Sequence, residues 1–90
     1  MTDEVITLIF ENASNENKKV SIMSVSSDPI VDYVANASKE IYSLTPSKVG
    51  LSTKDGTIVA KWSDKTVQEV IDTYNTNHFV IGTPDMLGYE

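Results

Sequence analysis

Few side chains in this chain of 90 residues could carry out catalysis. There is no cysteine, which excludes a thiol nucleophile, a thiolate metal site and a disulfide framework. The single histidine, His78, has no second histidine or cysteine as a companion ligand, so we expect neither a metal site nor a catalytic centre around it. It stands at the start of an apolar run, and we interpret it as a surface or edge-strand residue.

The carboxylates are the commonest reactive groups, and they are spread along the chain. No pair stands out as a general acid–base couple, and helix caps or solvated faces account for most of them. Those considered are Asp3, Glu4, Glu11, Glu16, Asp28, Asp32, Glu40, Asp55, Asp64, Glu69, Asp72 and Asp85. Phosphate-binding glycine loops, nucleophile elbows and calcium loops are also missing from the sequence. We therefore predict no catalytic residue, no metal ligand and no cofactor.

The charge balance argues against two classes of partner. Lysines number seven and acidic residues thirteen, there is no arginine, and the net charge is −6. An acidic surface repels phosphate backbones and anionic lipid headgroups, so nucleic acid and membrane are unfavourable partners. With no cysteine, no secretory signal pattern and no membrane-spanning run, we expect a monomeric protein of the cytoplasm, and also of the nucleus.

The remaining candidate for chemistry is the C-terminal segment that follows the last apolar run. We expect a domain over residues 1–82 and a flexible tail over residues 83–90, because Pro84 cannot donate to a sheet ladder and periodicity ends there. Gly88 lies near the end of this tail. A glycine carboxylate has no Cβ to obstruct a narrow catalytic channel, whereas a frayed terminus is the alternative interpretation.

The predicted domain that precedes this tail begins with a β-hairpin. Alternation predicts strands over residues 4–11 and 18–25, with a polar loop over residues 12–17 between them. Val5, Ile9 and Met23 fall on the face opposite the predicted helix. This exposed face is our candidate for partner binding.

A long helix is predicted next. Asp28 is expected to cap it, Pro29 suits its first turn, and it should end near Tyr42. Its apolar positions recur at helical spacing, as Ile30, Val34, Ala37 and Ile41.

The second half alternates short strands with a short helix. Strands are expected over residues 49–53, 58–59 and 78–81, with Trp62 shielding the edge of the core. A capping box between Thr66 and Glu69 opens a helix that reaches Tyr74. The order predicts an α+β protein of the β-grasp (ubiquitin-like) class, in which one long helix and a short second helix accompany a mixed sheet of four to five strands.

From about Lys18 to Gly88 the chain resembles the ubiquitin-fold modifier family. The segments that carry the resemblance are Asp28–Pro29, Glu40–Leu44, Ser52–Gly56, Thr66, Phe79–Ile81 and Asp85–Gly88, in this order and spacing. Members of that family end in a single glycine after a specific protease removes a short extension.

The resemblance implies that Gly88 is the conjugated terminus and that Tyr89 and Glu90 are a removed propeptide. It implies recognition of the tail through Pro84, Asp85, Met86 and Leu87. The partners implied are an activating enzyme that consumes ATP, a conjugating enzyme, a ligase, a processing protease and substrate lysines.

Two departures from the family pattern stand in this sequence. Its tail lacks the usual basic residues, and the family's chain-forming lysine falls near Tyr74, which makes poly-modifier chains through that site doubtful. The alternatives are a non-covalent ubiquitin-like binding or assembly subunit and a sulfur carrier. Sulfur carriers normally end at a glycine pair with nothing after it.

Overall fold

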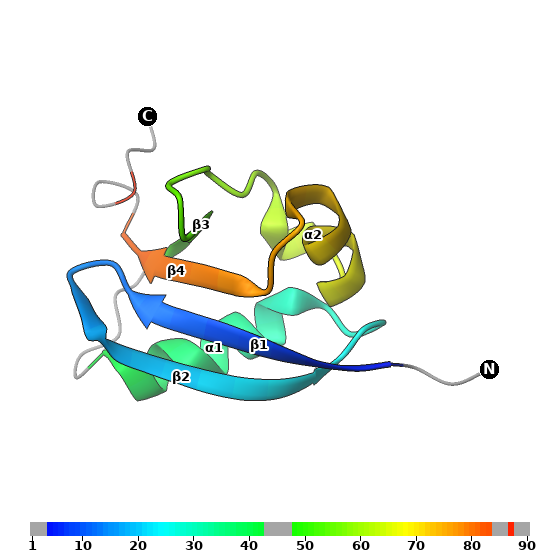
Figure 1. Ribbon diagram of the computed structural model, residues 1–90, viewed down its shortest axis with the longest axis horizontal. Helices are drawn as coiled ribbons and strands as arrows, with labels where there is room; N and C mark the ends of the chain where they lie inside the picture. Colours follow the sequence, from blue (N-terminus) through cyan, green and yellow to red (C-terminus); the bar gives the residue numbers. More distant parts are fainter. Residues whose placement is uncertain (1–3, 43–47, 84–86, 88–90) are drawn as a thin grey trace.

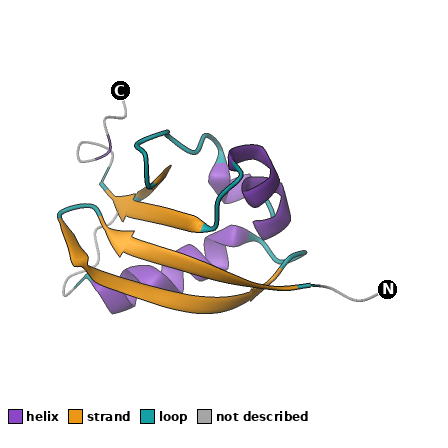
Figure 2. Cartoon of the chain, viewed as in Figure 1, coloured by secondary structure: helices purple, strands orange, loops and turns teal. Residues whose placement is uncertain are grey.

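The computed structural model describes residues 4–42, 48–83 and 87, and within them a mixed sheet is packed against a helix (Figures 1 and 2). The strands are β1 (Val5–Asn12), β2 (Asn15–Val25), β3 (Gly50–Thr53) and β4 (His78–Gly82). The helices are α1 (Ile30–Ile41), the 3-10 turn η1 (Trp62–Asp64) and α2 (Val67–Tyr74). None of the described helices is long and apolar enough to cross a membrane.

The sheet has the strand order β2-β1-β4-β3. β1 is antiparallel to β2 and parallel to β4, and β4 is antiparallel to β3. Figure 1 shows α1 crossing behind β1 and β2, with α2 beyond the start of β4. This is an α+β fold with β-grasp-like topology, as the sequence predicted. The division into a domain and a tail at residue 82 stays a prediction.

The first hairpin is tighter than expected. Only Ala13 and Ser14 separate β1 from β2, so the predicted loop over residues 12–17 is wrong. The Asn12 side chain explains the short turn: its Oδ1 accepts the Ser14 N–H at 2.7 Å, and its Nδ2 donates to the Ile41 carbonyl at 3.1 Å. The polar run is part of β2, in which Asn15 pairs with Asn12 and Lys19 with Glu11, and the register shifts between these two pairs.

The start of α1 also differs from the prediction. Pro29 occupies the N-cap position, and no side chain caps the helix. The Asp28 carboxylate instead accepts the Tyr33 hydroxyl at 2.6 Å. The Ile30 N–H, which has no partner within the helix, donates to the Lys65 carbonyl at 3.0 Å. A contact from the residue that follows η1 thus satisfies the first amide of α1 in place of a local cap.

The core lies between α1 and the inner face of the sheet. The predicted stripe of α1 is wholly buried, and it packs with Leu8, Phe10, Leu51, Phe79 and Ile81. The rings of Phe10 and Phe79 have centroids 6.2 Å apart across the parallel pair β1–β4. The two central strands therefore meet through aromatic packing on the inner side.

The second half of the chain is less regular than predicted. Residues 58–59 do not form a strand: Ile58 makes an isolated bridge to Ser52, while Val59 is buried in the core. Trp62 is half-buried against the core edge, as expected. The capping box of α2 is confirmed. The Thr66 side chain accepts the Glu69 N–H at 3.2 Å, and the Glu69 carboxylate accepts the Thr66 N–H at 3.0 Å.

Candidate functional site

The outer face of the sheet, which α1 does not cover, exposes the predicted apolar residues. Val5 is 61% exposed and Met23 67% exposed, whereas Leu8 on the inner face is fully buried. Ile9 lies on the same outer face and is half-buried. Strand alternation thus places all three side chains opposite α1, as predicted. Their role in partner binding stays a prediction.

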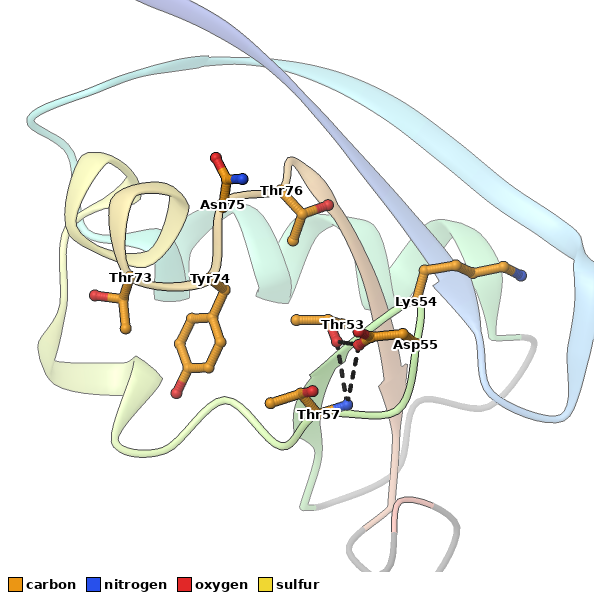
Figure 3. Close-up of a pocket in the computed structure, with 8 residues that line it drawn as sticks. All are labelled: Thr53, Lys54, Asp55, Thr57, Thr73, Tyr74, Asn75 and Thr76. Carbon is orange, nitrogen blue, oxygen red and sulfur yellow. Dashed lines mark hydrogen bonds between the residues drawn. The ribbon is translucent and has the colours of Figure 1, made fainter.

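A second feature is a cavity of about 430 Å³ between the turn after β3 and the end of α2, which we call the polar pocket (Figure 3). Its described lining residues are Thr53, Lys54, Asp55, Thr57, Thr73, Tyr74, Asn75 and Thr76. None of these is aliphatic, so the pocket offers hydroxyl, amide and charged groups. No local sequence pattern indicates this pocket, because its two walls are distant along the chain.

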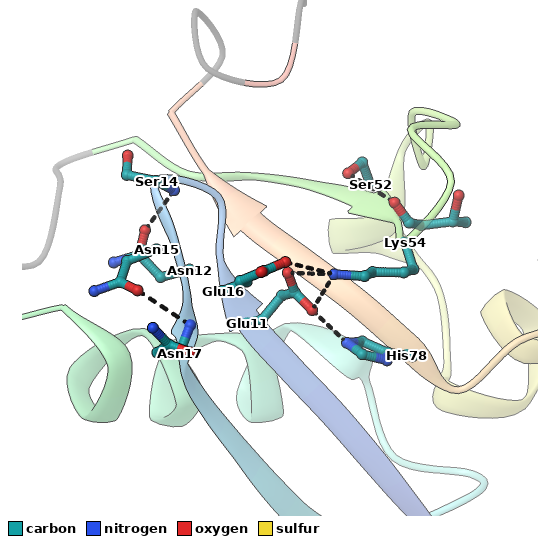
Figure 4. Close-up of polar contacts among 10 residues, drawn as sticks. Glu11, Asn12, Ser14, Asn15, Glu16, Asn17, Ser52, Lys54 and His78 are labelled. Atoms are coloured by element: carbon teal, nitrogen blue, oxygen red, sulfur yellow. Dashed lines mark hydrogen bonds and ion pairs between the residues drawn. The ribbon is translucent and has the colours of Figure 1, made fainter.

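The third feature is a group of ionisable side chains on the outer face, Glu11, Glu16, Lys54 and His78, which we call the Glu11 cluster (Figure 4). Lys54 Nζ lies 2.9 and 3.0 Å from the two oxygens of Glu11 and 3.6 Å from Glu16. His78 Nε2 lies 2.6 Å from Glu11 Oε1. One carboxylate therefore joins β1, β4 and the turn after β3.

Glu11 is only 5% exposed, so its charge depends on these neighbours. Burial alone raises the pKa of the Glu11 carboxyl, but the hydrogen bonds and charges of Lys54 and His78 outweigh it and hold the pKa below its usual value. In return, the hydrogen bond to Glu11 raises the pKa of the Lys54 ammonium. Glu11 therefore stays ionised at neutral pH and is a weak base.

This arrangement favours holding strands together over acid–base chemistry. Both Glu11 oxygens are bound by Lys54, and Oε1 also meets His78. A hollow of about 270 Å³ beside the cluster is lined by Glu11, Glu16, Asn17, Lys19, Lys54 and His78. Across residues 4–42, 48–83 and 87, no three acidic or histidine side chains converge to hold a metal ion.

The Glu11 cluster corrects one interpretation made from the sequence, the placement of His78 on an edge strand. His78 lies in β4, an interior strand, and its side chain is 27% exposed and bound to a carboxylate. It is therefore not an edge-strand residue, although its side chain is partly exposed on the outer surface of the sheet. Glu11 is buried and ion-paired, although nothing in its local pattern distinguished it from a solvated carboxylate. The parallel pairing of β1 with β4 brings them together, and that pairing is not visible in either strand alone.

Most of the predicted tail residues lie outside the described residues: Pro84, Asp85, Met86, Gly88, Tyr89 and Glu90. Leu87 is described, and it is half-buried. Its backbone N–H donates to the Thr83 carbonyl at 3.2 Å. Any extended conformation of the tail therefore requires this bond to open.

Comparison with known protein families, curated proteins and solved structures finds no match to this chain.

Proposed function

We propose that this protein is a ubiquitin-like modifier, conjugated to substrate lysines through the carboxylate of Gly88. The observation that carries the proposal is the β-grasp-like topology, in which β4 lies parallel to β1 in the middle of the sheet and leads into the C-terminal segment. The resemblance to the ubiquitin-fold modifier family supports it independently, since Phe79–Ile81 and Asp85–Gly88 carry part of that resemblance.

The length of the segment after β4 suits this role. Gly82 ends β4, and fully extended chain spans about 3.3–3.6 Å per residue, so Gly88 can reach roughly 20 Å from the sheet. That distance is enough to enter the active site of a second protein. Pro84–Leu87 would then be read by the processing and activating enzymes.

Under this proposal the partners perform all of the catalysis. A protease first removes Tyr89 and Glu90. An activating enzyme adenylates the Gly88 carboxylate with ATP and takes it as a cysteine thioester. A conjugating enzyme and a ligase pass it to a lysine, which forms an isopeptide bond. This chain contributes the carboxylate and its docking surfaces, and it works in the cytoplasm or nucleus.

The outer face supplies the docking surface of the proposal. Val5 and Met23 expose apolar side chains without a covering helix, and Ile9 continues this surface along β1. Apolar patches of this kind suit shallow recognition by partner proteins.

Intact mass spectrometry tests conjugation directly. The purified chain is incubated in eukaryotic lysate with ATP, and its mass is followed over time. Modifier function predicts loss of Tyr89 and Glu90, followed by an adduct that a thiol reductant cleaves. The matched Gly88→Ala variant should form no such adduct. An unchanged wild-type mass under these conditions would rule the proposal out.

One observation favours a second candidate, a non-covalent binding or assembly subunit. Leu87 is half-buried, and its N–H is bonded to Thr83 within the same C-terminal segment, so it takes part in a local turn rather than an extended strand. Such a subunit would co-purify with its complex equally well as wild type and as Gly88→Ala. A modifier would lose its covalent products in that variant.

A further inference from the structure

The polar pocket has a negative pole at one wall. α2 ends at Tyr74, and Thr73, Tyr74 and Asn75 line the pocket at that end. The aligned peptide dipoles of a helix place a partial negative charge at its C-terminus. Asn75, in the left-handed conformation, donates its N–H to Ile71 at 2.7 Å and closes the helix there.

The opposite wall adds a full negative charge. The Asp55 carboxylate accepts hydrogen bonds from the Thr53 hydroxyl and, at 3.4 Å, from the Thr57 N–H. These bonds, with that from Thr53 the strongest influence, lower the pKa of Asp55, which is therefore ionised at neutral pH. Because a carboxylate has about four acceptor positions, it can still bind a cation.

The one cation among the described lining residues is directed out of the pocket. Lys54 belongs to the same turn as Asp55, but its ammonium lies 2.9 Å from Glu11 on the outer face of the sheet (Figures 3 and 4). The Glu11 cluster thus prevents Lys54 from neutralising the pocket. Asp55 and the end of α2 remain without a compensating charge among the lining side chains.

An aromatic side chain completes the site. The Tyr74 ring lies between the end of α2 and the 53–57 turn in Figure 3, and its hydroxyl accepts the Ala60 N–H at 3.0 Å. That bond fixes the ring. A cation within about 6 Å of an aromatic centroid is attracted to the ring face.

We propose that the polar pocket binds the ammonium or guanidinium group of a basic ligand, with Asp55, the C-terminal end of α2 and the Tyr74 ring as its contacts. The cavity of about 430 Å³ is large enough for such a group and its alkyl stem. The chain's net charge of −6 favours the approach of cations. This site does not depend on the proposed conjugation, because it uses neither Gly88 nor the outer apolar face.

Amide NMR titration with N-acetyl-lysine amide tests the site on the full chain. We expect saturable shifts at Asp55, Thr57 and Asn75, and an intermolecular NOE between the Tyr74 ring and the ligand's methylene next to the ammonium. The neutral isostere N-acetyl-norleucine amide serves as the control probe and should cause no shift. Equal shifts with both probes, or no NOE at saturation, would overturn the proposal.

Two matched variants separate local recognition from overall charge. Asp55→Asn should weaken lysine-amide binding by about tenfold or more, because charge-assisted hydrogen bonds are about twice as strong as neutral ones. Asp64→Asn removes the same charge from the exposed η1 turn and should bind as wild type does. Equal affinities of the two variants would contradict a built site. The NOE in the wild-type chain decides the matter if Asp55→Asn does not fold.

The source of the cationic group is distinguished by two further probes. A peptide with one lysine among neutral residues represents a protein partner, and spermidine represents a free polyamine. Tighter binding of the peptide than of N-acetyl-lysine amide supports a protein ligand, whereas tighter binding of spermidine supports a polyamine. Failure of both to shift Asp55 and Asn75 would overturn the proposal. Conjugation through Gly88 would be unaffected by any of these results.

Discussion

The two faces of the sheet are built on different principles, although the same strands supply both. The inner face is mainly apolar: Phe10 and Phe79 meet beneath α1, and both are fully buried. The outer face has no covering helix, and its central strands are joined by the Glu11 carboxylate with Lys54 and His78. Apolar contact therefore secures one side of the β1–β4 pair, and ionic contact the other.

This difference separates stability from recognition. A buried ion pair contributes little net stability compared with apolar packing of similar size, since desolvation offsets much of the attraction. The inner face consequently carries most of the folding energy. Exposed residues of the outer face, such as Val5 and Met23, can therefore be substituted with little effect on the fold.

The largest effect is expected from Phe79→Ala, which opens a cavity on the inner face. Truncating a buried Phe typically costs about 3–5 kcal/mol, a large share of the roughly 5–13 kcal/mol expected for a domain of this size. The free energy of unfolding is measured by urea denaturation, monitored by circular dichroism. Val80→Ala, the next residue along β4 and half-buried on the outer face, is the control and should cost less. Equal losses would show that the two faces of β4 contribute equally to stability.

Removal of the central carboxylate should have an intermediate effect. Glu11→Ala removes the carboxylate that Lys54 and His78 share, and we expect a loss of about 0.5–1.5 kcal/mol, the usual net contribution of a hydrogen bond, because both partners keep access to water. The same denaturation experiment applies. Glu16→Ala removes the more distant and exposed carboxylate at 3.6 Å and should have no measurable effect. A larger loss for Glu16 than for Glu11 would show that the cluster is misassigned.

The contribution of Glu11 should also depend on pH, with a definite sign. Because its folded pKa lies below the unfolded value of about 4.3, its stabilisation is fully present above that value and is lost as pH falls through the folded pKa. The stability difference between wild type and Glu11→Gln should therefore shrink as pH falls below the unfolded pKa of Glu11. Unfolding curves recorded above and below that pKa measure it. A difference that grows as pH falls would contradict the assignment.

The smallest effect on stability is expected from Met23→Glu on the outer face. Met23 is 67% exposed, and exposed substitutions usually change stability by less than about 0.5 kcal/mol. Binding to an activating enzyme, measured by calorimetry, should nevertheless weaken if this face is the docking surface. Lys18→Glu, on an exposed residue of β2 nearer the hairpin turn, is the control. A large drop in the unfolding midpoint would show that Met23 belongs to the core.

Local patterns predicted the elements whose stabilising contacts are near in sequence. The stripe of α1 from Ile30 to Ile41 follows from helical spacing, and the Thr66–Glu69 capping box joins residues three apart. The alternation in β1 likewise separated buried Leu8 from exposed Val5. Each of these patterns is a direct consequence of helix or strand geometry.

The same local reasoning failed where a distant contact replaced a local one. Asp28 does not cap α1, because the Tyr33 hydroxyl takes its carboxylate and Lys65 receives the first free amide. The polar residues after Ser14 belong to β2 rather than to a loop, because Asn15 pairs with Asn12 and Lys19 with Glu11. Residues 58–59 make only a bridge at Ile58.

By itself the sequence determined the two helices, the cores of the main strands and their apolar faces, since these depend on periodicity along the chain. Only the tertiary structure decided the two sites. Glu11 meets Lys54 and His78 across separations of 43 and 67 residues, and Asp55 faces Thr73 and Tyr74 across the polar pocket. Such neighbours are set by the parallel pairing of β1 with β4 and by the packing of α2. No single segment contains that information, because it resides in how separate elements bury their apolar faces together.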